Sequence, residues 1–356
     1  MNDESMTSRI ASFLLLFLAV TGFAGSSRAE ILFQDDFDGS EDWTVTQGTS
    51  GSESCYTDCS MQGGWTAYNT YMTQCVEGIT GRPGNNSLYV GAAAGYPVDS
   101  EACRGGSGKC LTKWQEACLE PSTNFDDADA NVGYDMGSEY EDVYLRFYIK
   151  FPASFTINDG QAFKLWHTQH YDGGGASPWN YFERDTNNQP VISGGLRRAD
   201  ADYIDIYAEG RGYPDYYAHG FMFWRLGTYA WATAAGGILD GGWHSIEIRM
   251  RRNSAVGVAD GLIEVWFDGE EKTTWTDYPA DDINFTNGGS DLRGWRFVSV
   301  CGNNMSWTTA CSDGSGAMSE CEQWYAIDDV VISDQYIGPA SPGTPRPAAP
   351  TGLTAT

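Results

Sequence analysis

The chain of 356 residues is poor in basic residues and in histidine. It holds 21 Lys and Arg against 48 Asp and Glu, has only four His, and carries a formal net charge of -27. A surface with this excess of negative charge repels nucleic acid and anionic membranes, so we expect neither as a partner. The same charge disfavours a polyanionic sugar, unless basic residues gather at one site or salt screens the field.

Long apolar runs are missing after the N-terminal segment. Arg9 precedes an apolar stretch from Ile10 to Val20, and small residues follow up to Ser27-Arg28-Ala29. The stretch is shorter than the roughly 20 residues that a bilayer requires. This arrangement is typical of a secretory signal peptide, here residues 1–29. We therefore expect a secreted, extracellular protein that begins near Glu30.

The sequence has no Cys-x-x-Cys pair and no histidine close to its cysteines, which argues against a zinc site. In an exported chain, the nine cysteines instead predict disulfide bonds. Their odd number leaves one thiol unpaired or bound to another chain, and Cys311 with Cys321 is the simplest local pair. The cysteines form two groups: Cys55, Cys59, Cys75, Cys103, Cys110 and Cys118, then Cys301, Cys311 and Cys321.

Long amphipathic helices are absent, and short β-rich runs broken by Gly, Asn and Asp take their place. From Tyr144 to Phe151 the odd positions are apolar, which predicts a strand with one buried face and one face in water. Asp268-Gly269 predicts a tight turn, with Lys272 to Trp275 as the returning strand. The pattern indicates an all-β, two-sheet antiparallel β-sandwich. The same alternation predicts buried side chains at Ile204, Ile206 and Ala208, at Ile246, Ile248 and Met250, and at Ile263, Val265 and Phe267, with further strands at Trp295 to Val300 and Trp324 to Ile332.

Two segments, residues 50–124 and 173–200, lack the strand rhythm and are expected to form long loops, the first held by its cysteines. From residue 339 the sequence is rich in proline, which predicts a stiff linker over 339–356. Its last residues are similar to the opening of a fibronectin type III module. We therefore expect one sandwich domain over 30–338, acting as a monomer within a modular exported protein.

Three segments together resemble the concanavalin A-like jelly rolls of polysaccharide lyases and of lectin-like (laminin G-like) carbohydrate-binding domains. The resemblance covers about Glu30 to Gly338, leaves the Cys-rich insertion outside the pattern, and implies a polysaccharide partner. The segments are Phe33 to Gly39 with Trp43, then Gly242 to Ile248 followed by Asp260 to Gly269, and finally Ala326 to Ser333.

In this superfamily the first and last strands lie side by side, and a structural Ca2+ often lies between acidic residues there. The matching residues are Asp36, Asp38 and Asp328. Carboxylate oxygens are the ligands that calcium prefers. The alternative, that these residues only solvate turns, stays open. No organic cofactor is expected.

Aromatic and polar residues gather on two predicted strands, as carbohydrate binding requires. Regular alternation over Phe163 to Tyr171 turns Phe163 and Leu165 to the core. A β-bulge in that strand is the alternative, and it would bring out His167, Gln169 and Tyr171. In the next strand Tyr203, Asp205, Tyr207 and Glu209 share a water-facing side, and Arg211 and His219 follow. The predicted substrate-binding residues are Lys164, Trp166, Gln169, Tyr203, Asp205, Glu209 and His219.

Cleavage of a uronate polymer by β-elimination is the leading interpretation of this cluster. The base is His170 or His167, and the acid that protonates the leaving oxygen is Tyr207 or Tyr171. The substrate carboxylate is neutralised by Arg211, Lys164 or Gln169.

A noncatalytic carbohydrate-binding module uses the same residue types and is the main alternative. Hydrolysis ranks third. The strand Tyr203 to Glu209 resembles the carboxylate-rich strand of jelly-roll β-glucanases, but Tyr replaces two of the acids that those enzymes use. His244 begins a strand directly after Trp243, and we interpret it as structural.

Overall fold

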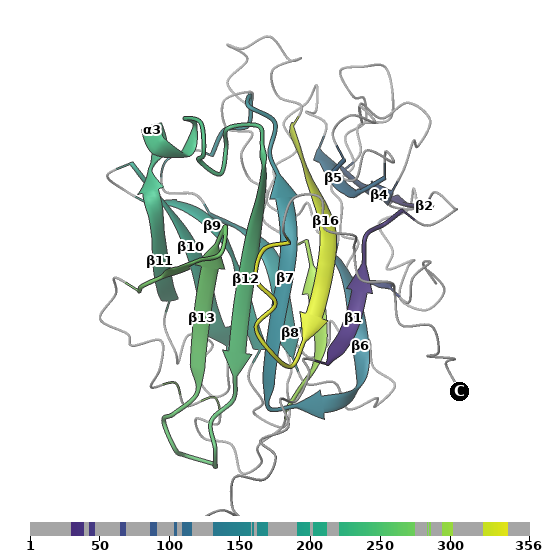
Figure 1. Ribbon diagram of the computed structural model, residues 1–356, viewed down its shortest axis with the longest axis vertical. Coiled ribbons are helices and arrows are strands. Elements are labelled where there is room, and N and C mark those ends of the chain that lie inside the picture. The colour runs from purple at the N-terminus through teal and green to yellow at the C-terminus, as the bar shows by residue number, and fades with distance from the viewer. Residues whose placement is uncertain are drawn as a thin grey trace, which may run out of the picture.

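The protein is a sandwich of two antiparallel sheets, as predicted (Figure 1). In the computed structural model one sheet has nine strands, in the order β14-β13-β12-β7-β16-β5-β4-β2, with β1 beside β16. The other has seven, in the order β11-β10-β9-β8-β15-β6-β3. The structure describes residues 30–38, 43–46, 65–68, 86–90, 103–104, 109–115, 131–157, 159, 162–169, 191–199, 202–211, 221–274, 283, 285, 294–301 and 323–340. The predicted signal peptide and residues 341–356 therefore lie outside the described part.

The strands predicted from strict alternation are present, but β9 lies within residues 173–200, which were expected to form a loop. The nine-stranded sheet is formed by β1 (Ile31–Asp35), β2 (Trp43–Thr46), β4 (Asn86–Val90), β5 (Leu111–Gln115), β7 (Asp142–Lys150), β12 (Trp243–Arg251), β13 (Leu262–Phe267), β14 (Glu270–Lys272) and β16 (Gln323–Ser333). The seven-stranded sheet is formed by β3 (Thr66–Tyr68), β6 (Asn131–Tyr140), β8 (Ala162–Gln169), β9 (Val191–Ala199), β10 (Tyr203–Arg211), β11 (Phe221–Thr228) and β15 (Trp295–Val300). One turn of helix, α3 (Tyr229–Ala232), follows β11. No helix in these described ranges is long and apolar enough to cross a membrane.

The core lies between the two sheets, where alternate side chains of each strand meet. Leu145, Phe147 and Ile149 of β7 are fully buried there, as the alternation predicts. The other strands whose alternation was predicted contribute their apolar positions to the same core. The tight turn is also confirmed, because Asp268 and Gly269 have the positive φ angles (50° and 80°) of a two-residue hairpin. The returning strand, β14, begins at Glu270, two residues earlier than expected.

The outer face of β7 does not face water, contrary to the prediction. Tyr144, Arg146 and Tyr148 are all buried. The chain after β16 crosses in front of β7 in Figure 1, and Arg146 donates a hydrogen bond to the carbonyl of Gly338 at 2.9 Å. Sequence alternation reports which side chains share a face, but not what covers that face from a distant part of the chain.

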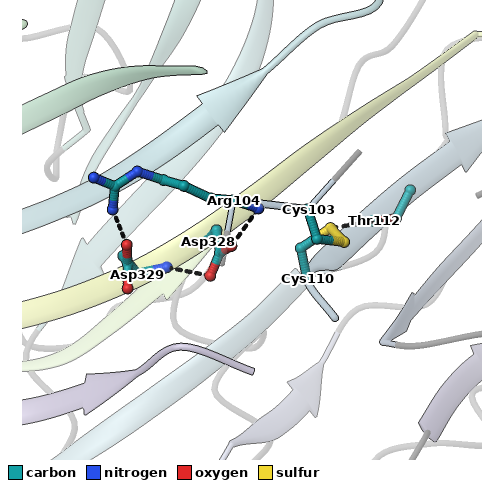
Figure 2. Close-up of a disulfide and its surroundings, with 6 residues drawn as sticks. All are labelled: Cys103, Arg104, Cys110, Thr112, Asp328 and Asp329. Atoms are coloured by element: carbon teal, nitrogen blue, oxygen red, sulfur yellow. Dashed lines mark hydrogen bonds and ion pairs between the residues drawn. A yellow bond between two sulfur atoms is a disulfide. The ribbon is translucent and has the colours of Figure 1, made fainter. Parts of the chain in front are cut away.

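The Cys-rich region contains strands, which corrects the prediction of loops alone. Strands β3, β4 and β5 all lie within residues 50–124. A disulfide joins Cys103 to Cys110 just before β5, beside Asp328 and Asp329 of β16 (Figure 2). Among the described cysteines Cys301 is the free thiol, and burial raises its pKa to about 11. The proposed Cys311–Cys321 pair lies outside the described residues.

Candidate functional site

A β-bulge in β8 determines which residues of this strand share a face. Lys164 pairs with Gly195 of β9, but Trp166 pairs with Gly194, so Leu165 is the extra residue. Past the bulge His167 pairs with Ser193. Lys164 and His167, three residues apart, therefore lie on the same face of the sheet. This is the second of the two alternatives that the sequence left open.

The bulge also moves Trp166 into the core, which corrects its expected place on the outer face. The side chain is fully buried. A Cβ atom at Gly194 would lie 2.0 Å from Trp166 Cζ2, so the indole occupies the space above that glycine. A side chain in this position cannot reach a ligand on the other face of the sheet.

The outer face of the seven-stranded sheet carries a set of polar side chains in three adjacent rows, which we call the polar face. Residues directly opposite each other in antiparallel strands project to the same side. One row runs from Lys164 through Gly195 to Tyr207, and His167 of the next row lies between Ser193 and Ser299. The polar face comprises Lys164, His167, Ser193, Arg197, Asp205, Tyr207, Arg225 and Ser299.

Only small residues of β9 separate the reactive groups of β8 from those of β10. Gly195, which has no side chain, lies between Lys164 and Tyr207. Ser193, two residues before Gly195 in the same strand, is the neighbour of His167. Lys164 and Tyr207 are therefore two strand spacings apart, roughly 9.5 Å, with little side-chain bulk between them.

The centre of the polar face is buried, whereas the sequence analysis expected it to face water. Lys164 is 5% exposed, His167 1%, Asp205 0% and Tyr207 4%. Among the described residues, Ser299 Oγ is also buried and has no hydrogen-bond partner. Burying ionisable groups is costly, and a buried cluster of them is a candidate for a site that acts on a ligand.

Positive charge concentrates at this face, in a chain whose net charge is strongly negative. Asp205 lies in register between Arg197 and Arg225, and Arg225 Nε donates to Asp205 Oδ1 at 3.3 Å. With Lys164 one row away, the described side chains of this face include three basic groups and the carboxylate of Asp205. Glu209, whose side chain lies outside the described part, is in register with Ser193 on the same face. The polar face is thus a local gathering of basic groups, which an acidic polymer requires at the surface of so acidic a protein.

Two arginines of the polar face lie over aromatic rings. Arg225 lies 3.7 Å from the centre of the Tyr203 ring, and Arg197 lies 4.7 Å from that of Phe223. Each guanidinium thus occupies one face of its ring. Tyr203 is therefore held by Arg225, in addition to lying beside Asp205 as expected.

The remaining predicted site residues are described only in part. The backbone of Gln169 pairs with Phe297, that of Glu209 with Ser193, and that of Arg211 with Val191, but their side chains lie outside the described part. The three other predicted residues, His170, Tyr171 and His219, lie outside it entirely.

Sequence reasoning missed four members of the polar face. Arg225 could have been found, because Phe223 and Arg225 alternate with the core residues Met222 and Trp224. Arg197 alternates with Leu196 in the same way. Ser193 and Ser299 gave no such signal, because only the register of β8 brings them beside His167.

The predicted calcium ligands do not form a cluster in the described residues. The carboxylate of Asp328 is buried and accepts the backbone N–H groups of Arg104 and Asp329, at 3.0 and 2.7 Å (Figure 2). Asp36 Oδ1 accepts the N–H of Asp38 at 3.2 Å. No group of three potential metal ligands occurs within the described ranges. The described residues thus show no cluster of these three carboxylates, and calcium binding stays a prediction.

Comparison with known proteins gives matches to solved structures alone. No protein-family model matches the chain, and no curated protein matches it. A glucuronan lyase from the fungus Trichoderma reesei is 14% identical, with a TM-score of 0.40 over 69% of this chain and 94% of its own. An alginate lyase from a Chlorella virus is 12% identical, with a TM-score of 0.36 over 76% and 93% of the two chains.

A non-specific endo-β-1,3(4)-glucanase from family GH16 is also similar. It is 12% identical, with a TM-score of 0.41 over 87% of this chain and 96% of its own. These are proteins of the kinds that the sequence resemblance named. At such low TM-scores and identities the overlaps say nothing about activity, so the functional proposal rests on the residues of the polar face.

Proposed function

We propose that this is a secreted protein that binds an acidic polysaccharide on the polar face and cleaves it by β-elimination. The observation that carries the proposal is the position of Lys164 opposite Tyr207, separated only by Gly195 of β9, with His167 in the adjacent row beside Ser193. These side chains are the cation, the base and the acid that the reaction needs, and one sheet face holds all three.

In the proposed reaction Lys164 neutralises the uronate carboxylate, which acidifies the adjacent C5–H. His167 removes the C5 proton, and the electron pair of that C–H bond forms the C4–C5 double bond. The C4–O bond breaks at the same time, and Tyr207 donates its phenolic proton to the leaving oxygen. No water molecule is consumed, so one new end is unsaturated and the other is an ordinary sugar end.

The arginine–ring contacts of the polar face argue against an open binding strip. A lectin-like strip offers ring faces to sugars, but Arg225 and Arg197 each occupy one face of the Tyr203 and Phe223 rings. The enclosed Lys164 and His167 instead resemble catalytic groups, because a low-dielectric site strengthens their electrostatic effect on a reacting atom.

Hydrolysis has less support. A glycoside hydrolase uses two carboxyl groups flanking the scissile bond, about 5–9.5 Å apart. Asp205 is the carboxylate of the described polar face, and it is already paired with Arg225. Its neighbours on the same side of β10, Tyr203 and Tyr207, are phenols.

The test is incubation of the mature protein with a panel of acidic and neutral polysaccharides, followed by three assays on each mixture. The proposal expects ultraviolet absorbance from unsaturated ends with acidic polymers only, and loss of that absorbance in Lys164→Met and His167→Gln. Retention of a polymer without new ends would identify a binding module. Reducing ends without unsaturation would identify a hydrolase.

A further inference from the structure

Tyr336, just after β16, is an exposed aromatic side chain that its neighbours hold in place. It is 44% exposed, and among the described residues it is the one aromatic side chain that is exposed rather than buried or half-buried. Its ring centre lies 5.0 Å from that of Trp266 in β13 and 6.5 Å from that of Tyr144 in β7. The ring also folds back over Gly338, where a Cβ atom would lie 3.3 Å from Tyr336 Cε1. Three contacts thus fix a ring that solvent still reaches.

The segment 336–340 that carries this ring is itself attached to the nine-stranded sheet, and Figure 1 shows it crossing the front of that sheet. The two carboxylate oxygens of Glu247 in β12 accept the N–H groups of Ile337 at 2.7 Å and Gly338 at 2.8 Å. Glu247 is only 3% exposed, so the attachment is buried. The position of Tyr336 over the sheet is therefore set before any ligand arrives.

Trp266 and Tyr336 together form a surface that we call the aromatic platform, and carboxylates lie beside it. Trp266, which is half-buried, lies in register between Glu247 and the exposed Glu271 of β14. Burial and the carboxylates of Glu247 and Glu271 raise the pKa of Tyr336 above its usual 10.0. Its hydroxyl therefore keeps its proton and can donate a hydrogen bond.

The next row of the sheet adds a guanidinium in a fixed position. Arg249 Nη2 donates to Asp142 at 2.6 Å, and Arg249 Nη1 donates to Glu264 at 2.8 Å. All three side chains are partly exposed. The aromatic platform is thus flanked by planar donors and acceptors whose positions are determined by one another.

We infer that the aromatic platform is a second binding site and that its ligand is a neutral polysaccharide. Sugar rings place their apolar C–H faces on aromatic rings, and their hydroxyls bond to planar polar groups. Trp266 and Tyr336 supply the rings, and Glu271 and Arg249 supply the polar groups. The site goes beyond the proposed function, because it lies on the nine-stranded sheet, whereas the polar face belongs to the seven-stranded sheet.

Charge separates the ligand class of the platform from that of the polar face. A uronate carboxylate at Trp266 would meet the exposed carboxylate of Glu271, and Arg249 is already paired with two acids. Like charges repel, so an acidic polymer is disfavoured there. A protein partner is disfavoured too, because the cores of protein interfaces are depleted of charged residues. A neutral glycan fits, because its hydroxyls donate to carboxylates.

Affinity electrophoresis of the mature chain in native gels tests the site. Each gel contains one soluble polymer, with a β-glucan, a xyloglucan and a galactomannan as neutral probes and polygalacturonate as the acidic probe. Slowed migration as a function of polymer concentration gives the dissociation constant. The proteins compared are the wild type, Tyr336→Ala, Tyr336→Phe and Tyr229→Ala. The half-buried Tyr229 of α3 lies outside the platform and is the matched control.

At least one neutral polymer should slow the wild type. Tyr336→Ala should raise the dissociation constant roughly 10-fold, since it removes one stacking ring. Tyr336→Phe keeps the ring and should bind nearly as well, and Tyr229→Ala should match the wild type. The inference is overturned if no neutral polymer slows the wild type, or if Tyr336→Ala binds as tightly as the wild type. Equal losses in Tyr336→Ala and Tyr336→Phe would overturn stacking on the ring.

The same variants separate this site from the polar face. Release of unsaturated product from polygalacturonate, and any retardation by that polymer, should be the same in Tyr336→Ala as in the wild type. A wild type that binds a neutral polymer but releases no unsaturated product would contradict the proposed function alone. A wild type that releases the product but binds no neutral polymer would contradict the second site alone.

Discussion

The indole of Trp166 lies over Gly194 of the neighbouring strand, in the space that a Cβ atom would occupy. The two residues are in register only because Leu165 is the extra residue of the bulge in β8. A large side chain facing a glycine therefore fixes the bulge. The bulge in turn places Lys164 and His167 on one face.

Replacing Gly194 by Ala is expected to destabilise the fold. The added methyl group would lie 2.0 Å from Trp166 Cζ2, and overpacking of this kind costs about 1–3 kcal/mol. Urea unfolding of the wild type and Gly194→Ala measures the cost. In a Trp166→Phe background the smaller ring makes room, so the same change should cost less. An equal cost in both backgrounds would mean that the ring is not above Gly194.

His244 is expected to stabilise the fold most strongly at low pH. Burial alone lowers the pKa of His244, but the hydrogen bonds that its ring donates to the carboxylates of Asp268 at 2.7 Å and Asp240 at 3.1 Å outweigh burial and raise the pKa above its usual 6.5. The protonated form is thus favoured in the folded state. Its contribution is complete below pH 6.5 and is lost as the pH rises through the folded-state pKa.

The check compares the free energies of unfolding of the wild type and His244→Gln at pH 6 and pH 9. The advantage of the wild type should be larger at pH 6. A difference between the two proteins that does not depend on pH would show that the two carboxylates do not hold a charged imidazole.

Asp35, like His244, should stabilise the fold more at low pH than at high pH. The change should fall in a lower pH range than that of His244. Burial raises its pKa to about 6 from 3.8, although its carboxylate accepts hydrogen bonds from the N–H of Phe37 and from Trp65 Nε1. Its stabilising contribution is therefore complete below pH 3.8 and is lost as the pH rises through 6. Relative to Asp35→Asn, the wild type should be more stable at pH 4.5 than at pH 7.5. The reverse order would contradict the burial of this carboxyl group.

Local sequence patterns predicted the strictly alternating strands and their buried faces, because alternation depends only on neighbouring residues. They did not predict β3, β4, β5 and β9, which lie in segments expected to be loops. Ile204, Ile206 and Ala208 are buried as expected. The bulge at Leu165 was one of two alternatives, since the Trp166–Gly194 contact that selects it joins different strands. Likewise, no local signal shows that Arg146 lies beneath the segment 336–340.

The candidate site was predicted as a set of residue types rather than as a geometry. Tyr207 and Lys164 were correctly assigned to the same face as Asp205. The alternation of Arg225 with the core residues Met222 and Trp224 could have revealed its face, but its pairing with Asp205 across β10 and β11 could not be predicted locally. The basic character of the face follows from that pairing, so it could not be read from a sequence whose overall charge is acidic.

The central claim is that the polar face performs β-elimination with Tyr207 as the acid. The most direct test is the initial rate of unsaturated-product release from a polyuronate by the wild type, Tyr207→Phe and Tyr144→Phe. Tyr144 is the matched control, because it is similarly buried but lies on the other sheet. Tyr207→Phe should lose roughly 100-fold or more of the rate, as loss of a general acid does, while Tyr144→Phe keeps it. A Tyr207→Phe protein with the full wild-type rate, or a wild type that releases no unsaturated product from any polyuronate, would contradict the claim.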